Sequence, residues 1–241
     1  MKRLIDRLRS SGSAAVFTGA GVSTLCGIPD FRGPQGLYRQ PDAERIFDID
    51  WFRQDPAIYY RGCRELVYGL RGYEPGPVHH AIVRLEHAGV VKGVITQNID
   101  MLHQKAGSGK VYEVHGSGLI HRCFHCGRVK TFDEICVMLE SVDVPRCEAC
   151  GGPFKPDITF FGEALPQDAF NGAVSLAQAA DLMLVLGSSL TVQPAASIPA
   201  ITVHYGGAMV IINAQPTPFD AIATLRYPDL QAFADAVLEA F

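Results

Sequence analysis

The chain has 241 residues, 48% of them hydrophobic and 19% charged, which is enough for one sizeable hydrophobic core, alone or with a smaller module. Its formal net charge of −4 excludes the strongly basic surface that nucleic-acid-binding proteins usually present. No apolar run approaches the about 20 residues of a membrane span, and the N-terminal segment lacks the apolar stretch of a signal peptide. We therefore expect a cytoplasmic protein that binds neither nucleic acid nor membranes.

Apolar runs alternate with amphipathic segments along the chain. Residues 1–13 mix charged and apolar side chains and predict a short amphipathic helix. Near-continuous apolar runs are typical of parallel strands that are covered on both faces. They predict four core strands, at Ala14–Phe17, Val91–Ile95, Leu182–Leu186 and Met209–Ile212. The helices predicted between and after these strands are Asp55–Leu70, Val78–Ala88, Asp168–Ala180 and Pro228–Phe241.

Strands that alternate with helices favour an α/β fold, here a Rossmann-like doubly wound parallel sheet. Two regions break the pattern, because residues 33–76 are rich in charge, aromatics and proline and residues 116–156 hold paired cysteines. We interpret these regions as insertions that together form a smaller helical and zinc-binding module. The remaining segments, 1–32, 77–115 and 157–241, then form the Rossmann-like domain with the candidate dinucleotide site.

In such a sheet, ligands bind outside the carboxyl ends of the strands. The four predicted strands run there into polar or glycine-rich sequences, which are Thr18–Ser23, Thr96–Asp100, Gly187–Ser189 and Asn213–Gln215. Gly19 and Gly21 fit a turn that brings a diphosphate close to backbone amides at a helix N-terminus. The alternative is that they only allow a tight turn, since the third glycine of the dinucleotide fingerprint is missing.

Two Cys-x-x-Cys pairs have the spacing of two zinc knuckles, and their cysteines are Cys123, Cys126, Cys147 and Cys150. Four sulfur ligands close the coordination sphere of one zinc ion, so the metal is expected to be structural and not catalytic. A redox or incidental pairing is the alternative. Five other residues are interpreted without a metal: His121 and His125 as surface residues, and Cys26, Cys63 and Cys136 as structural thiols.

Further motifs follow one another in a characteristic order and spacing. They are Gly19–Ser23, Gly27–Arg32, Thr96–Asp100, His115–Gly116, the four cysteines, Phe161–Glu163 and Gly187–Leu190. With these motifs the chain resembles the sirtuins, the Sir2-like family of NAD-dependent protein deacetylases, of the bacterial type. The resemblance covers almost the whole chain.

The resemblance implies an NAD-dependent protein lysine deacetylase that consumes NAD as a co-substrate and yields nicotinamide, O-acetyl-ADP-ribose and free lysine. His115 matches the family's catalytic histidine, whose imidazole accepts a ribose hydroxyl proton near neutral pH. Asn98 and Asp100 match catalytic residues of the nicotinamide pocket. The residues implied to contact NAD are Gly19, Ala20, Gly21, Ser23, Thr24, Phe31, Arg32, Gln97, Asn98, Ile99, Asp100, His115, Gly187, Ser188, Ser189 and Asn213.

The resemblance also implies that an acetyl-lysine protein or peptide binds as an added strand. The matching residues are Phe161, Gly162, Glu163, Leu190 and Val192. Members that remove succinyl or malonyl groups carry Tyr-x-x-Arg in the helical insertion, where the cation meets the acyl carboxylate. The matching stretch here, Tyr60–Cys63, lacks the arginine, and Tyr68–Arg71 has the spacing but aligns poorly. We therefore expect an uncharged acyl group, acetyl first.

Three alternatives stay open. A sirtuin-type enzyme that prefers another acyl group, or that transfers ADP-ribose to protein, shares every NAD-binding residue with a deacetylase. A non-enzymatic zinc-ribbon protein would use the cysteine knuckles to bind a partner. The acidic net charge and the polar ends of all four predicted strands weigh against this last alternative. The chain is expected to be a monomer.

Overall fold

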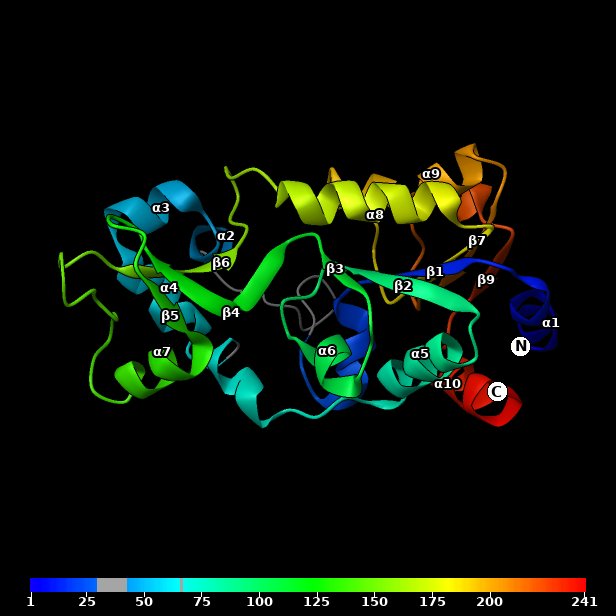
Figure 1. Ribbon diagram of the computed structural model, residues 1–241, viewed down its shortest axis with the longest axis horizontal. Coiled ribbons are helices and arrows are strands. Elements are labelled where there is room, and N and C mark those ends of the chain that lie inside the picture. Colours follow the sequence, from blue (N-terminus) through cyan, green and yellow to red (C-terminus); the bar gives the residue numbers. More distant parts are fainter. Residues whose placement is uncertain (30–42, 66) are drawn as a thin grey trace.

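The computed structural model describes residues 1–29, 43–65 and 67–241 (Figure 1). Its larger sheet has six parallel strands in the order β3-β2-β1-β7-β8-β9. The strands are β1 (Ala14–Thr18), β2 (Val91–Thr96), β3 (Val111–Glu113), β7 (Leu182–Leu186), β8 (Ala208–Ile212) and β9 (Leu225–Tyr227). The chain first builds outward from β1 through β2 and β3, then continues on the other side of β1 with β7. The predicted doubly wound parallel sheet is confirmed, and its direction of winding changes between β1 and β7.

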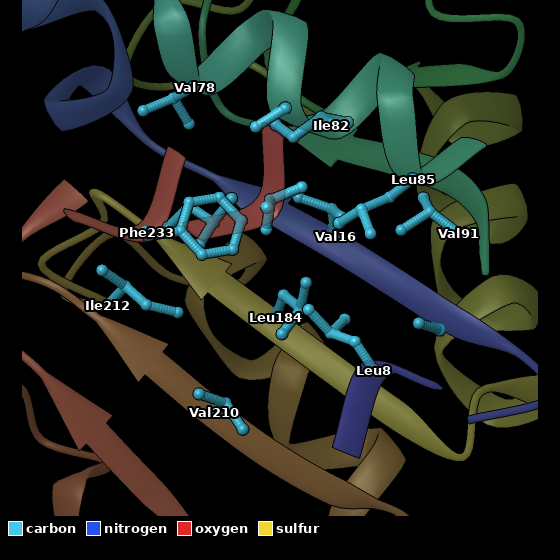
Figure 2. Packing of buried hydrophobic residues seen from close by; sticks show 14 of the residues in the cluster. Leu8, Val16, Val78, Ile82, Leu85, Val91, Leu184, Val210, Ile212 and Phe233 are labelled. Carbon is cyan, nitrogen blue, oxygen red and sulfur yellow. The ribbon is translucent and has the colours of Figure 1, made fainter. Parts of the chain in front are cut away.

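Helices cover both faces of this sheet. On one face lie α1 (Lys2–Ser10), α5 (Pro77–His87) and α10 (Leu230–Ala240); on the other lie α8 (Gln167–Ala179) and α9 (Ile198–His204). Figure 2 shows the first face, where Val78, Ile82 and Leu85 of α5 pack over Val16 of β1. Because alternate residues of each strand point to opposite faces, β1 and β7 are buried along their whole length.

A smaller antiparallel sheet lies at the other end of the molecule, with the strand order β5-β4-β6 (Figure 1). Its strands are β4 (Gly116–Cys123), β5 (Val129–Thr131) and β6 (Phe154–Ile158). The helices around it are α2 (Ala43–Ile46), α3 (Ile49–Gln54), α4 (Pro56–Cys63) and α7 (Phe132–Leu139). Buried aromatic rings fill the space between these helices and β6, among them Phe52, Tyr59 and Phe160.

Short helices and turns complete the fold. They are the 3₁₀ helices η1 (Ala20–Cys26), η3 (Tyr68–Gly72), η4 (Ala195–Ser197) and η5 (Asp220–Ile222) and the short helix α6 (Leu102–Ala106). The segment after Gly21, predicted as a helix, is therefore the 3₁₀ helix η1.

Two sequence predictions are wrong in the smaller sheet's surroundings. The predicted helix Asp55–Leu70 is shorter in the structure: α4 stops at Cys63, and the side chain of the next residue, Arg64, donates to the carbonyls of Leu139 and Val142. His121, predicted to lie at the surface, is fully buried, and its Nε2 lies 3.0 Å from the hydroxyl of Tyr68.

The predicted division into domains stays a prediction. β4 begins at Gly116, where the second insertion was placed, whereas β6 runs across the predicted boundary at residues 156 and 157. Within the described ranges, no helix is long and apolar enough to cross a membrane.

Candidate functional site

A cleft of about 320 Å³ opens at the carboxyl ends of β1, β2, β7 and β8. This is the place where ligands bind in doubly wound sheets, beside the change of winding direction. Most of the predicted site residues line it: Gly19, Ala20, Gly21, Gln97, Asn98, Ile99, His115, Phe161, Gly162, Glu163, Gly187, Ser188, Ser189, Val192 and Asn213. The structure thus brings together residues that are far apart in the sequence.

The floor of the cleft is a close contact between two strand ends. A Cβ atom on Gly19 would lie 2.8 Å from the carbonyl oxygen of Gly187, and one on Gly21 would lie 2.7 Å from the Cα of Gly187. The Gly21 amide donates to the Gly187 carbonyl over 2.9 Å. These glycines therefore let β1 and β7 meet at the cleft, and the Gly21 amide is already engaged inside the protein. These contacts support the alternative that Gly19 and Gly21 allow a tight turn. Both glycines nevertheless line the cleft.

A buried polar cluster stands behind Asn98. The carboxylate of Asp100 accepts hydrogen bonds from the Ser23 hydroxyl (2.6 Å), the Asn98 side-chain amide (3.1 Å) and the Leu102 backbone amide (3.0 Å). The Asn98 amide also donates to Ser23 over 3.2 Å. Because both hydrogens of the Asn98 amide group point toward Ser23 and Asp100, its Oδ1 is oriented as an acceptor. Ser23 and Asp100 themselves do not line the cleft and act through Asn98.

His115 lies half-buried in the cleft wall. Its Nδ1 is 3.1 Å from the backbone carbonyl of Gln97. A carbonyl oxygen only accepts, so Nδ1 carries the hydrogen, and Nε2 is the basic nitrogen of the neutral ring. The Gln97 side chain in turn accepts from the Ser188 hydroxyl over 2.7 Å, which ties the end of β2 to the end of β7.

The segment Phe161–Glu163, here called the peptide edge, forms one rim of the cleft. The Phe161 amide donates to the Phe47 carbonyl, and the Phe161 carbonyl accepts from the Ile49 amide. Both backbone groups of Phe161 are therefore used within the protein. Gly162 is exposed and has a φ of 91°, a conformation that favours glycine.

Besides Ser23 and Asp100, two of the predicted residues that the structure describes do not line the cleft, Thr24 and Leu190. Thr24 is exposed, and its hydroxyl donates to the Gly21 carbonyl. Leu190 is buried, and its amide donates to the Ser188 hydroxyl. Phe31 and Arg32 lie outside the described residues.

The predicted site residues do not include eight residues that line the cleft: Phe47, Ile158, Thr159, Phe160, Leu165, Gln193, Pro194 and Gln215. Most are apolar and carry no chemical signal of their own. Thr159 lies two residues before the recognised segment Phe161–Glu163, and its amide donates to the His115 carbonyl over 2.8 Å.

The four predicted metal ligands come together at the tip of the smaller sheet. Their sulfur atoms all lie within 4.8 Å of one another, with Cys123 and Cys150 at 3.3 Å and Cys126 and Cys147 at 3.7 Å. A tetrahedral zinc ion with Zn–S bonds of about 2.3 Å requires sulfur atoms about 3.8 Å apart. The four cysteines thus fit one zinc ion with no coordination position to spare. Gly127 and Gly151, which follow the two pairs, have the positive φ values of knuckle turns.

Comparison with known proteins shows which family the chain resembles. Residues 19–194 match the model of the Sir2 family. The chain is 47% identical to the NAD-dependent protein deacetylase of Thermotoga maritima, over 99% of this chain and 97% of that protein.

Solved structures agree. A Sir2 protein with a deacetylated p53 peptide and 3′-O-acetyl ADP ribose has a TM-score of 0.95 and 47% identity, over 99% of this chain and 97% of that one. Sir2Tm bound to a propionylated peptide has a TM-score of 0.91 and 45% identity, with the same coverage of both chains.

Proposed function

The chain belongs to the Sir2 family, and from this premise we propose that its cleft carries out the NAD-dependent deacetylation of protein lysines. The products are nicotinamide, O-acetyl-ADP-ribose and free lysine. The observation that supports this most is that one cleft joins the ends of four parallel strands, the His115 imidazole and the exposed edge at Gly162. A dinucleotide fits the strand ends, and an extended peptide fits the edge.

His115 is proposed as the general base. The hydrogen bond to Gln97 holds Nδ1–H and leaves Nε2 as the nitrogen that accepts a proton. Its task is to accept the proton of a ribose hydroxyl of bound NAD. General base catalysis of this kind contributes about 10²–10⁴-fold to a rate.

Asn98 and Asp100 are proposed to hold the nicotinamide end of NAD. Asp100 fixes Asn98 through its side-chain amide, and the Ser23 hydroxyl fixes Asp100 in turn. The oriented Oδ1 of Asn98 can then accept from a carboxamide N–H, so a bound amide satisfies a buried acceptor. The remaining NAD contacts are proposed at the positions given above, Ser188, Ser189 and Asn213 among them.

An uncharged acyl group suits the cleft. None of the described residues that line it is a lysine or arginine. Tyr60 is buried and donates to the Phe154 carbonyl, while Arg71 pairs with Asp133 away from the cleft. Without a cation to meet an acyl carboxylate, acetyl is proposed as the preferred group, with other uncharged acyl groups as further substrates.

The zinc ion is proposed to be structural. The four cysteines would hold it, and what it supplies when bound is a crosslink between the two knuckles, because all four positions are sulfur. No group in the cleft comes from this site, so the chemistry belongs to the strand ends and His115.

Mass spectrometry of an acetyl-lysine peptide, incubated with the zinc-loaded protein with and without NAD, tests the function. We expect loss of the acetyl group only with NAD, together with nicotinamide and O-acetyl-ADP-ribose. A peptide that keeps its acetyl group and gains ADP-ribose would instead establish the transferase. No turnover of any acyl peptide would contradict the proposal.

Three further predictions concern the protein as a whole. The monomeric state is checked by light scattering, the lack of nucleic-acid binding by titration with duplex DNA at several salt concentrations, and the cytoplasmic location by cell fractionation.

A further inference from the structure

A lysine side chain is buried beside the peptide edge, where no step of the proposed mechanism uses it. Lys155 of β6 is 8% exposed, and its ammonium donates to the carboxylate of Glu163 over 2.8 Å. The same ammonium donates to the backbone carbonyls of Ile158 (2.8 Å) and Pro156 (3.2 Å). It also lies 4.1 Å from the centre of the Phe160 ring. A buried cation needs such partners, because removing it from water without them is costly.

These contacts span the turn that carries the peptide edge. Ile158 precedes the turn, and Glu163 ends it. The Glu163 amide donates to the Phe160 carbonyl over 3.0 Å, and the Phe160 amide donates back to the Glu163 carboxylate over 2.8 Å. One carboxylate oxygen therefore accepts from both Lys155 and Phe160, so the lysine fixes the group that closes the turn.

Gly162 lies inside this turn and has little freedom of its own. A Cβ atom there would approach the Ile49 side chain to 2.9 Å, and the neighbouring Phe161 backbone is bonded on both sides to Phe47 and Ile49. The direction in which the Gly162 amide and carbonyl point is thus set by Phe161 on one side and by Glu163 on the other. Only the second restraint depends on a charge.

We propose that Lys155 is a positioning residue for the substrate peptide, and that it acts through Glu163 on the backbone of Gly162. This inference rests on the proposed function. It assigns to a buried ion pair the task of holding the rim of the cleft in the conformation that pairs with an added strand. Strand addition depends on backbone geometry, so a small change at Gly162 weakens peptide binding.

The charge of Lys155 matters for this role because its ammonium is buried. Burial lowers the pKa of the Lys155 ammonium, and the Glu163 carboxylate opposes this shift. Removing Lys155 or Glu163 leaves the other charged group without its ion-pair partner, and we expect the turn to rearrange as a result.

The test is steady-state kinetics of Lys155→Met with zinc-loaded protein, first with acetyl-lysine peptide varied at saturating NAD, then with the reverse. We expect the KM for peptide to rise about tenfold or more, as for the loss of a charge-assisted hydrogen bond. We expect kcat and the KM for NAD to stay within about twofold of the wild type, since the cleft floor is untouched. A purely structural role would instead lower kcat through loss of folded enzyme and leave the KM for peptide unchanged; this result would overturn the proposal.

Arg122→Met is the matched control. Arg122 of β4 and Asp157 of β6 form an ion pair of the same length, 2.8 Å, but the Arg122 side chain is exposed and the pair does not include the Glu163 carboxylate that closes the turn. We expect the kinetics of this variant to equal those of the wild type. A rise in its KM for peptide as large as that of Lys155→Met would contradict the assignment to Lys155.

Glu163→Gln keeps the proposal testable if Lys155→Met does not fold. This variant retains an oxygen for the Phe160 amide and removes the charge that Lys155 meets, so the KM for peptide rises here too. Because the lysine acts through the carboxylate, the KM for peptide of the double variant Lys155→Met/Glu163→Gln should be no higher than that of the more affected single variant. Additive losses would show two independent contributions and overturn the proposal.

Direct binding separates this inference from the proposed function. The anisotropy of a fluorescent acetyl-lysine peptide reports affinity without turnover. Wild-type protein that binds the peptide but does not deacetylate it contradicts the function alone, and weaker binding by Lys155→Met then still supports the inference. No binding of peptide by the wild type overturns both.

Discussion

The two sheets of the molecule are stabilised by different chemistry. In the six-stranded sheet, β1 and β7 are buried along their whole length, and aliphatic side chains from helices cover both faces. In the three-stranded sheet, β5 is mostly exposed, the interior is rich in aromatic rings and holds a buried tyrosine–histidine contact, and four cysteines gather at one end. We expect the larger sheet to be stable through its buried apolar surface and the smaller one to depend on a metal.

The difference suggests a division of tasks. The larger sheet presents the strand ends that are proposed to bind NAD, Asn98 among them. The smaller sheet contributes the peptide edge at the end of β6, together with the lysine that fixes it. Loss of zinc is therefore expected to weaken peptide binding more than NAD binding.

Removal of zinc should have the largest effect. Structural zinc sites supply about 10–16 kcal/mol of apparent binding free energy, so a chelator or Cys147→Ser should unfold the smaller sheet. Deacetylation is then lost. Hydrogen exchange should show loss of protection in β4 and α7, while β1 and β7 remain protected.

The contradicting result is uniform loss of protection in both sheets, which would make them one cooperative unit. Cys136→Ser is the control, since Cys136 belongs to α7 but not to the zinc cluster. Its zinc content should equal that of the wild type.

Leu184→Ala should have the next largest effect and should act on the other sheet. Leu184 is fully buried in the centre of β7, where it faces the cluster shown in Figure 2. A cavity of this kind costs about 2–5 kcal/mol of unfolding free energy. Urea unfolding of zinc-loaded and zinc-free protein should show a similar loss in both forms; a loss only with zinc would refute the independence of the larger sheet.

The sequence alone predicted those strands and helices whose buried residues form an apolar run or a periodic apolar pattern. β7 follows its apolar run from end to end, and α8 is displaced by one residue. β3 and β9 have three residues each, of which Arg226 of β9 is exposed and the others are half-buried, and this is too short for a pattern. The end of α4 at Cys63 was not predicted from the sequence; the next residue, Arg64, contacts carbonyls more than 70 positions later in the chain.

The same distinction applies to the site. Gly19, Asn98 and His115 stand in polar or glycine-rich motifs, and the strand ends that carry them do meet in one cleft. Phe47 reaches the cleft only because its carbonyl bonds the distant Phe161 amide. Gly187 could be expected to lie at the cleft, but its close contact with Gly21 could not, because that contact joins two strands far apart in sequence.

Acid should destabilise the larger sheet through a buried histidine. His103 is 1% exposed, packs against His79 and lies 2.9 Å from the Thr18 hydroxyl. Burial, aided by the neighbouring His79, lowers the pKa of His103 to about 3. Between that value and the ordinary pKa of about 6.5, the unfolded chain binds a proton that the folded protein does not. Stability is therefore complete above about pH 6.5 and falls as the pH falls, by about 2 kcal/mol between pH 7 and pH 5.

His103→Gln should remove this contribution. Urea unfolding at pH 7 and pH 5 should show a smaller acid loss in the variant than in the wild type. The Asp100 carboxylate, whose charge raises the pKa of the adjacent His79, is present in both proteins. His87→Gln, an exposed position on α5, should leave the wild-type loss intact. Equal losses in wild type and His103→Gln would exclude this residue as the cause.

Tyr60→Phe should have the smallest effect, confined to the smaller sheet. The Tyr60 hydroxyl is buried and donates to the Phe154 carbonyl over 2.6 Å. Loss of one such hydrogen bond costs about 1 kcal/mol. We expect a lower thermal midpoint of zinc-loaded protein with unchanged acyl preference; acquired activity on a succinyl peptide would show that Tyr60 does take part in acyl selection.

The central claim is that the strand-end cleft performs the chemistry with His115 as its base. Single-turnover deacetylation of an acetyl-lysine peptide by wild type and His115→Ala, with NAD and peptide affinities measured on the same samples, tests it most directly. The account predicts a rate lower by about 10²–10⁴-fold in the variant, with both affinities within about threefold of the wild type. A His115→Ala protein that deacetylates at the wild-type rate would contradict the account.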